Sequence, residues 1–379
     1  MSRTTPPAGP VSLCRPDWLY KIVVDYAGFG AHLTGTDADR STADWLTNLI
    51  SEIGGTATFE PFAFDRFDVR AKLVANGRAV PSVPLYYSAT GSFDTDDAQV
   101  VRFGAGVAGS APAFEERLRS LDSRAVVIAV DGPDELPVQC NRFPTKMLGL
   151  PGMIVPGNWF DRLGKAQLRL RFDASIEPAT SANVLATFGS ADSPAIAVTT
   201  PLTGWTPAAG ERGTGLAAAL AVAVELSSEY SVYFSACSGH EIDHIGLRHH
   251  LAQRDVRSVP VVHFGASIGA GAVEPGVSGA LELASTRMAL TTATGPCRAD
   301  IAELTTGANW TLRDVEPPWP GEGGTWQEAG TSVLSFLGPF TLFHTAHDTP
   351  ERATTPEALQ LATTVALAAA RRFLEDASQ

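Results

Sequence analysis

The chain has 379 residues, which is longer than one ordinary domain, and 44% of them are hydrophobic. We therefore expect two domains, or one domain with a large insertion, around a sizeable core. Aspartate and glutamate number 41 against 28 lysines and arginines, giving a formal net charge of −13. No basic run offers a surface that follows phosphates, so the composition argues against nucleic acid as a partner.

The first residues, MSRTTPPAGPVSLC, are polar and contain prolines, without the apolar stretch of a secretory signal. No later window has the uninterrupted apolar length of a membrane span. We therefore expect a cytoplasmic protein without membrane contact. The cysteines, Cys14, Cys140, Cys237 and Cys297, are isolated from one another, which predicts free thiols instead of disulfides or a thiolate zinc cluster.

The first clear element is an amphipathic helix over residues 41–53, which Gly54 and Gly55 end. Beyond it, short apolar runs alternate with glycine and proline: VPLYY, AVVIAV, GMIVP and LRLRF predict strands, and EERLRSL predicts a helix. We interpret residues 66–180 as an inserted, strand-rich module. Residues 1–65 and 181–379 then form the two parts of the main domain.

After the insertion, strands and helices alternate. The segments NVLATF, AIAVTT, YSVYFSA and VPVVHFG predict strands, while TGLAAALAVAVELSS, LRHHLAQR and the C-terminal EALQLATTVALAAARRFLED predict helices. This order indicates an α/β fold with a mainly parallel mixed sheet flanked by helices. Ligands bind beyond the carboxyl ends of such strands, so TTPLTGW, SACSGHEIDH and GASIG are the segments of interest.

The stretch GHEIDHIGLRHH, residues 239–250, holds four of the eight histidines. His240, Glu241 and His244 spell H-E-x-x-H, a pattern that binds zinc when both histidines share one helix face. The preceding YSVYFSACSG, however, predicts a strand that ends in small residues. We therefore expect His240 and Glu241 to lie in a turn, not in a zinc-binding helix.

Other segments resemble the M28 zinc aminopeptidases, a group that includes the glutaminyl cyclases. HLTGTDADRSTADWLTNLISEIGG is similar to that family's first helix and the turn before it, and GLPGMIVPGNW is similar to its protease-associated insertion. AIAVTTPLTGW stands where the family has a strand that ends in H-x-D. Glu211-Arg-Gly-Thr-Gly215 stands where the family has D-N-x-S-G, and Asp243-His-Ile-Gly-Leu247 stands where it has E-E-x-G-L. The most specific match is FHTAHDTPE at 343–351, which follows Y-H-T-x-x-D-T-x-E.

The resemblance implies a metal site whose ligands can be followed position by position. The family holds two zinc ions bridged by one aspartate. For one ion, the ligand positions fall at Pro201 and Ser267, which cannot hold zinc. For the other they fall at Glu211, His244 and His344, which can. The resemblance therefore implies one zinc ion held by one glutamate and two histidines, with water as the fourth ligand.

The resemblance also assigns roles around this metal. Asp243 takes the position of the catalytic glutamate and would act as general base, with Glu241 in reserve. Asp348 would orient the ligand histidine or cap the last helix. His240 and Trp205 would line the substrate pocket.

For several residues a structural interpretation stands beside the functional one. Cys237, just beyond a strand end near the substrate pocket, is either a nucleophile with His240 as its base or, preferably, a small buried thiol. Trp326, in the loop 307–330, either forms a wall of the substrate pocket or anchors that loop. We expect His249 and His250 to face solvent on a helix, and His263 to be a hydrogen-bonded core residue.

Three functions follow from these assignments. The first is a single-zinc hydrolase that cleaves an amide bond of a small or short peptide substrate, with cyclisation as a close variant. The second is a metal-independent enzyme that uses the 240–244 cluster and His344 for acid–base chemistry such as elimination or rearrangement. The third is a non-catalytic binding protein on the same fold. The sequence leaves the substrate and the oligomeric state open.

Overall fold

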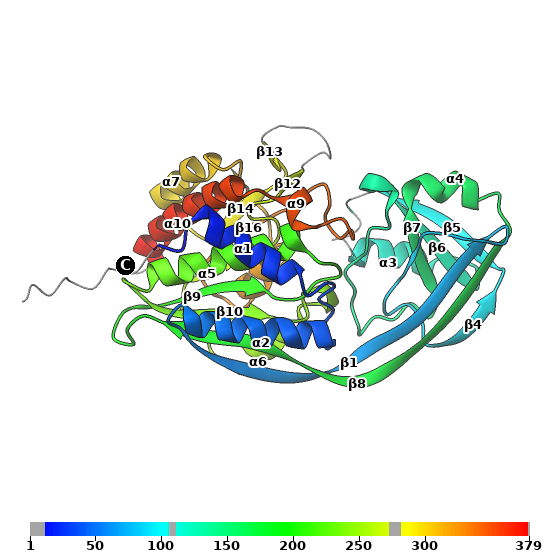
Figure 1. Cartoon of the computed structure of the whole chain (residues 1–379), viewed down its shortest axis with the longest axis horizontal. Helices are drawn as coiled ribbons and strands as arrows, with labels where there is room; N and C mark the ends of the chain where they lie inside the picture. Colours follow the sequence, from blue (N-terminus) through cyan, green and yellow to red (C-terminus); the bar gives the residue numbers. More distant parts are fainter. Residues whose placement is uncertain (1–11, 105, 107–110, 273–281, 378–379) are drawn as a thin grey trace, which may run out of the picture.

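The computed structural model describes residues 12–104, 106, 111–272 and 282–377. It consists of a larger α/β domain and a smaller strand-rich module, which lie side by side in Figure 1. Residues 1–11, on which the expectation of no secretory signal mainly rests, lie outside the described residues. Within the described ranges, no helix is long and apolar enough to cross a membrane.

The main sheet is mixed, with parallel strands at its centre. Its order is β15 (Thr311–Leu312), β14 (Met288–Thr291), β16 (Val333–Leu337), β11 (Val261–Phe264), β9 (Ala195–Pro201), β10 (Ser231–Cys237), β8 (Leu168–Phe188), β1 (Thr56–Ala75) and β2 (Arg78–Ala79), and β4 (Gly91–Thr95) also pairs with β8. The run β16-β11-β9-β10 is parallel, whereas β8 and β14 add to it antiparallel. The predicted α/β class with a mainly parallel mixed sheet is confirmed.

Both faces of this sheet are covered, which explains why its strands read as continuous apolar runs. Alternate residues belong to different cores: Ile196 and Val198 pack in the larger core, while Ala197 between them packs in a smaller one. The same alternation holds on β11, where Val262 packs in the larger core and Val261 in the smaller one. Since strand side chains alternate between faces, the two cores lie on opposite sides of the sheet.

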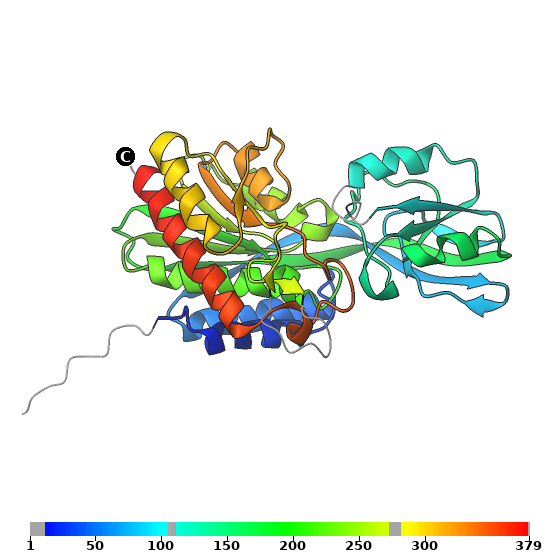
Figure 2. The ribbon, with the colours of Figure 1, turned by 90° about the horizontal axis from the view of Figure 1, so that it is seen from above.

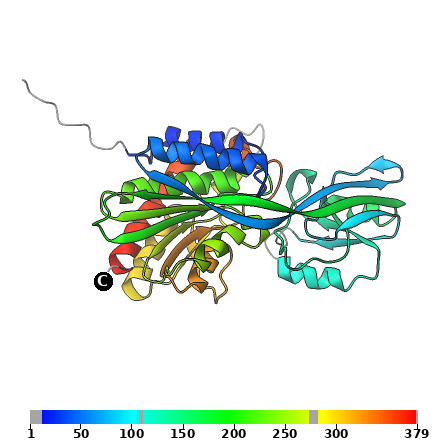
Figure 3. The same cartoon turned by 90° about the horizontal axis from the view of Figure 1, so that it is seen from below.

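Helices on each side supply the other half of each core. The larger core contains residues of α1 (Pro16–Ala27), α2 (Asp37–Glu52), α5 (Thr214–Leu226), α7 (Gly295–Thr306) and α10 (Pro356–Ala377); the smaller core contains residues of α6 (Ile245–Ala252) and α8 (Glu322–Glu328). Figure 3 shows α1, α2 and α5 above the sheet and α8 below it. Helix α5 is apolar all round because it packs between the sheet and the outer helices α1 and α10.

A two-stranded antiparallel ribbon connects the domain to the module. Strands β1 and β8 stay paired from Thr56 opposite Thr187 to Ala75 opposite Leu168, and they run from the main sheet into the module (Figures 1 and 2). The expected module boundaries, at 66 and 180, both fall inside this ribbon, where Arg66 pairs with Glu177. The chain therefore passes between the two parts without leaving β-structure.

The module has a sheet and a core of its own. Its sheet has the order β3 (Val83–Pro84), β7 (Gly152–Pro156), β6 (Ala125–Val130) and β5 (Ala98–Phe103), and its helices are α3 (Ala111–Arg119) and α4 (Phe160–Leu163). The central strand β6 is buried at every position. A small pair, β12 (Gly271–Ala272) with β13 (Glu282–Leu283), and a short helix α9 (Pro350–Ala353) complete the elements of the main domain.

Candidate functional site

The candidate site lies where the central parallel strands end. The chain leaves β9 at Pro201, β10 at Cys237, β11 at Phe264 and β16 at Leu337, all along one edge of the sheet. In α/β sheets this carboxyl edge is where ligands bind. The amide of Leu202 donates to the carbonyl of Cys237 at 2.7 Å, which joins the first two of these turns.

The backbone at this edge is locally strained. Of the nine non-glycine residues with positive φ in the described chain, five lie here: Ala208, Asp243, His244, Ser267 and His344. Such conformations persist only where the surrounding structure imposes them, and they concentrate at functional sites. The segment Ala209–Gly213 adds a short π-helical turn, η4, at the start of α5, which is another feature common at such sites.

The H-E-x-x-H segment forms a turn, as the strand before it predicted. Strand β10 is followed by Gly239 in the left-handed region and by the 3₁₀ turn η5 (His240–Ile242). Helix α6 begins only at Ile245, with His244 as its left-handed N-cap residue. The two histidines therefore do not share a helix face, although their ring centroids lie 4.7 Å apart.

Glu211 is the centre of a buried ion cluster. Its Oε1 lies 2.8 Å from Nη2 of Arg212 and 3.1 Å from Nε2 of His344, and all three side chains are shielded from solvent. Burial raises the pKa of Glu211, but the charges of Arg212 and His344 outweigh it and lower the pKa to about 2. Nδ1 of His344 lies 2.8 Å from the carbonyl oxygen of Gln139. Both ring nitrogens of His344 therefore face oxygen atoms.

This cluster does not fit the zinc site that the resemblance implies. Zinc needs deprotonated donors that converge on one point, typically four in a tetrahedron. Glu211 instead forms an ion pair with Arg212, whose guanidinium is always charged and cannot ligate a metal, and its Oε1 also lies 3.1 Å from Nε2 of His344. Nδ1 of His244 is 2.9 Å from the hydroxyl of Thr325. Among the described residues, no three His, Cys, Asp or Glu side chains are grouped so that they could hold a metal ion.

The two positions of the other family metal offer no replacement. Pro201 ends β9 with its side chain buried. Ser267 is buried, and its amide donates to the carbonyl of Glu211 at 3.2 Å. Neither side chain is a zinc ligand.

His240 pairs with a carboxyl group that sequence reasoning did not single out. Its Nδ1 lies 3.2 Å from Oε1 of Glu322, at the first residue of α8. Burial raises the pKa of Glu322 from 4.5 to about 8, and burial together with the charge of Arg212 lowers the pKa of His240 well below 6.5. At neutral pH the proton therefore resides on Glu322, which donates it to a neutral imidazole.

The two predicted bases lie elsewhere. Asp243 is partly exposed, and its carboxylate lies 3.3 Å from Nη2 of Arg248, one turn further along the chain. Glu241 is buried, and its carboxylate accepts hydrogen bonds from the amide and hydroxyl of Thr34 and from the hydroxyl of Thr203, at 2.6–2.9 Å. Within the described part of the chain, neither carboxylate forms a hydrogen bond or an ion pair with Glu211, Arg212 or His344.

Asp348 holds the backbone of the ion cluster in place. Its carboxylate accepts from the amides of Gly210 and Glu211 at 2.6 and 3.0 Å, at the start of η4. The resemblance implied that it would orient His344 or cap the last helix; among the described residues, its side chain is hydrogen-bonded to these two amides. It instead satisfies free amides at the beginning of the π-helical turn, and burial raises its pKa from 3.8 to about 8 although these amides act to lower it.

A loop of the inserted module closes over this edge. Besides the side-chain contact already described, the amide of Gln139 donates to the carbonyl of His344 at 3.0 Å, and the amide of Arg142 donates to the carbonyl of Glu241 at 2.9 Å. The indole of Trp205 donates to the side chain of Asn141 at 3.0 Å. The module therefore contributes directly to the candidate site.

Three of the residues expected at the substrate pocket fall into two groups. Trp205 lines a cavity of about 170 Å³ between the domain and the module. Trp326 and Cys237 are instead 1% exposed and pack together in the smaller core, with Leu247 of α6. Burial raises the pKa of the Cys237 thiol well above 9, so the structural interpretation of this residue holds.

Two further histidines, His250 and His263, are buried in the core. His263 is buried and its Nδ1 lies 2.9 Å from the hydroxyl of Thr199, in agreement with the expectation. His250 was expected to face solvent, and that prediction is wrong: it is fully buried and its Nδ1 contacts the carboxylate of Glu60 at 2.9 Å. The long strand β1 passes under α6 and covers this face of the helix, which the local sequence does not reveal.

Comparison with known proteins places this geometry in context. No protein-family model matches the chain, and no curated protein matches it. Among solved structures, a zinc aminopeptidase from Bacillus subtilis is 16% identical with a TM-score of 0.72, covering 94% of each chain. The fold is similar to that of the zinc aminopeptidases. Two further structures have a similar fold. A peptidase M28 precursor from Shewanella amazonensis is 14% identical with a TM-score of 0.72, covering 94% of this chain and 92% of that one. An aminopeptidase from Aneurinibacillus is 14% identical with a TM-score of 0.64, covering 94% of this chain and 93% of that one.

Sequence reasoning missed Arg212 and Glu322. Arg212 could have been found, because a cationic side chain directly after a supposed metal ligand conflicts with a metal at that position. Glu322 carries no comparable signal: it lies in GEGG, inside the loop-rich stretch 307–330, and only the formation of α8 brings it to His240.

Proposed function

We propose that this chain is a metal-independent enzyme on an aminopeptidase-like fold. Its substrate would be a small molecule with an amide or related carbonyl group. The enzyme would use acid–base catalysis to hydrolyse, cyclise or eliminate part of that substrate. The observation that carries the proposal is the buried ion pair at this edge, in which the guanidinium of Arg212 lies 2.8 Å from the carboxylate of Glu211. The charge that a cation would balance at this edge is already balanced by the protein itself.

The His240–Glu322 pair supports the acid–base part of the proposal. Two carboxyl groups at one sheet edge have pKa values pushed in opposite directions, with Glu211 lowered to about 2 and Glu322 raised to about 8. Such divergence is how proteins keep an acid and an anion side by side at neutral pH. With Glu322 donating to Nδ1, the other ring nitrogen of His240 carries a proton. It can give that proton to a substrate while Glu322 replaces it.

Metal analysis and turnover together test this proposal. Protein purified without chelators should contain far less than one zinc per chain. Activity found in a panel of N-acyl amino acids, dipeptides and N-terminal glutaminyl peptides should survive chelator treatment. It should be lost in Glu322→Gln, because the amide cannot give up a proton, and should persist in Glu328→Gln, an exposed glutamate of the same helix. One tightly held zinc per chain, or activity that chelators abolish and zinc restores, would overturn the proposal.

A further inference from the structure

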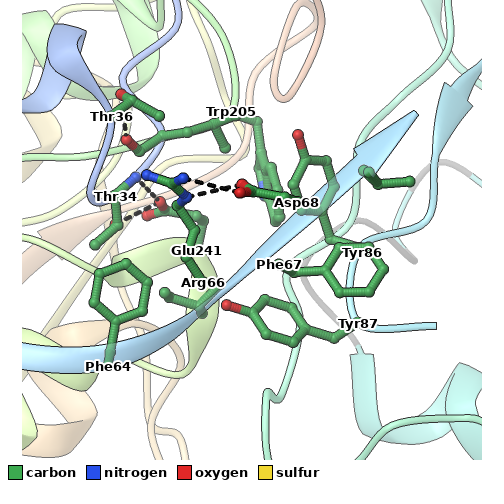
Figure 4. A pocket seen from close by; sticks show the side chains of 13 residues that line it. Thr34, Thr36, Phe64, Arg66, Phe67, Asp68, Tyr86, Tyr87, Trp205 and Glu241 are labelled. Atoms are coloured by element: carbon green, nitrogen blue, oxygen red, sulfur yellow. Dashed lines mark hydrogen bonds and ion pairs between the residues drawn. The ribbon is translucent and has the colours of Figure 1, made fainter. Parts of the chain in front are cut away.

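The cavity between the domain and the module has the composition of a cation-binding site. It encloses about 170 Å³ and is lined by parts of both units: Leu33, Thr34, Thr36, Phe64, Arg66, Phe67, Asp68, Val69, Tyr86, Tyr87, Trp205, Glu241 and Ile242. A cavity of about 150 Å³ is large enough for benzene, so a ligand of comparable size fits. Figure 4 shows the polar and aromatic side chains that surround it.

A buried carboxylate forms one wall. Glu241 is 1% exposed, and every group that hydrogen-bonds its carboxylate is neutral: the amide and hydroxyl of Thr34 and the hydroxyl of Thr203. Within the described ranges, no arginine, lysine or histidine forms an ion pair with it. A buried charge is costly unless a counter-charge accompanies it. The cavity is the space from which such a counter-charge can reach Glu241.

The nearby arginine does not supply that counter-charge. Arg66 also lines the cavity, but its Nε and Nη2 bind the carboxylate of Asp68 at 2.8 and 2.9 Å, and its Nη1 binds the carbonyl of Gly35 at 3.0 Å. All three guanidinium nitrogens are therefore engaged, and the dashed lines in Figure 4 mark the contacts with Asp68. With Asp68 neutralised by Arg66, the cavity keeps one net negative charge, that of Glu241.

Aromatic rings form the rest of the wall. The rings of Tyr86 and Trp205 lie 4.8 Å apart between centroids, and Phe67 lies 5.8 Å from Tyr86 and 5.2 Å from Tyr87. Aromatic faces attract organic cations, most strongly where water is excluded. They also provide an apolar surface for the alkyl part of such a ligand.

We propose that this cavity binds the primary ammonium group of a small organic amine. Oε1 of Glu241 accepts two hydrogen bonds and Oε2 only one, so Oε2 keeps a free acceptor position. A primary ammonium can donate to that position while its carbon chain lies against the aromatic rings. This inference does not depend on the chemistry at His240 and Glu322, and its test requires no turnover.

The test uses the full chain and two probes of similar size, butylammonium and the neutral butan-1-ol, in ligand-detected NMR titrations. Butylammonium should bind with a dissociation constant of about a millimolar, as expected for so few atoms, and more weakly at high salt. Glu241→Gln should weaken this binding by about tenfold or more, because it removes the charge that the ammonium contacts. Glu116→Gln, which removes an exposed charge of the module, is the matched control and should bind like the wild type.

A second variant changes the affinity in the opposite direction. Arg66→Gln removes the positive charge at the cavity and leaves Asp68 free, so butylammonium should bind about threefold more tightly. This result stays informative even if Glu241→Gln fails to fold. Equal binding of the two probes by the wild type, unchanged affinity in a folded Glu241→Gln protein, or weaker binding by Arg66→Gln would overturn the proposal.

Discussion

Replacing Glu322 by glutamine changes how stability depends on pH. Burial raises the pKa of Glu322 from 4.5 to about 8. Between these values the unfolded carboxyl group is ionised while the folded one keeps its proton, so the folded state binds one more proton. The contribution of this group to the unfolding free energy is fully present below pH 4.5. It is lost as the pH rises towards 8, at about 1.4 kcal/mol per pH unit.

Glutamine has no proton to lose, so Glu322→Gln lacks this slope. Relative to the wild type, the variant should gain about 3 kcal/mol in unfolding free energy between pH 5 and pH 7, from two pH units at the slope given above. Its amide can still donate to Nδ1 of His240, which keeps the local contact. Urea titrations at pH 5, 6 and 7 measure the difference directly. Glu328→Gln, on the exposed side of the same helix, should follow the wild type at each pH.

Parallel plots of unfolding free energy against pH for the two proteins would refute this reasoning. If the wild type and Glu322→Gln differ by the same amount at all three pH values, Glu322 is ionised in the folded protein. The acid of the proposed acid–base pair would then not exist at neutral pH.

Three further substitutions test other parts of the structure. Arg212→Ala should lower the unfolding free energy by about 3–5 kcal/mol, since it leaves the Glu211 carboxylate buried without its main counter-charge; guanidinium denaturation measures this, and a loss below 1 kcal/mol would contradict the buried ion pair. Burial lowers the pKa of His263 to about 3, so its contribution is present above pH 6.5 and lost on acidification. Between pH 6.5 and pH 5, the unfolding free energy of His263→Asn should therefore fall by about 2 kcal/mol less than that of the wild type. An equal fall in both proteins would show that the histidine is protonated when folded. Gly246→Ala should lower the melting temperature although alanine favours helices, because the added Cβ would collide with the carbonyl of Ser238 and the side chain of Asn183; Gly164→Ala, whose Cβ would meet only a carbonyl oxygen at 3.6 Å, should not.

Local patterns were sufficient for most elements of the main domain. The helix expected at 41–53 is α2, which begins four residues earlier because Thr36 caps it and accepts from the amide of Asp39 at 3.3 Å. The apolar runs AVVIAV and GMIVP became strands because glycine, proline and polar residues bound them on both sides. The same reasoning placed His240 and Glu241 in a turn, since the strand before them has to end at Gly239.

Long-range pairing escaped this kind of reasoning. The segment 56–75 carries no regular alternation of burial, yet it forms one strand because β8 pairs with it along its entire length. His250 lies on a helix as expected, but Glu60 of β1 binds it from underneath. The β1–β8 pairs join residues 93 to 131 positions apart and the Glu60–His250 contact joins residues 190 positions apart, so no local period encodes them.

The sequence by itself determined that this is an α/β protein with its candidate chemistry at the strand ends, because hydrophobic period and turn residues are local properties. Of the three proposed ligands, Glu211 and His344 lie 3.1 Å apart, whereas His244 contacts Thr325 and His240 instead. What only the tertiary structure decided is the charge balance among them. Whether a carboxylate binds a metal or a guanidinium depends on the direction of neighbouring side chains within a few ångströms, and here Arg212 points back onto Glu211. The same holds for Glu322 and Glu241, whose chemistry follows from what folding buries beside them.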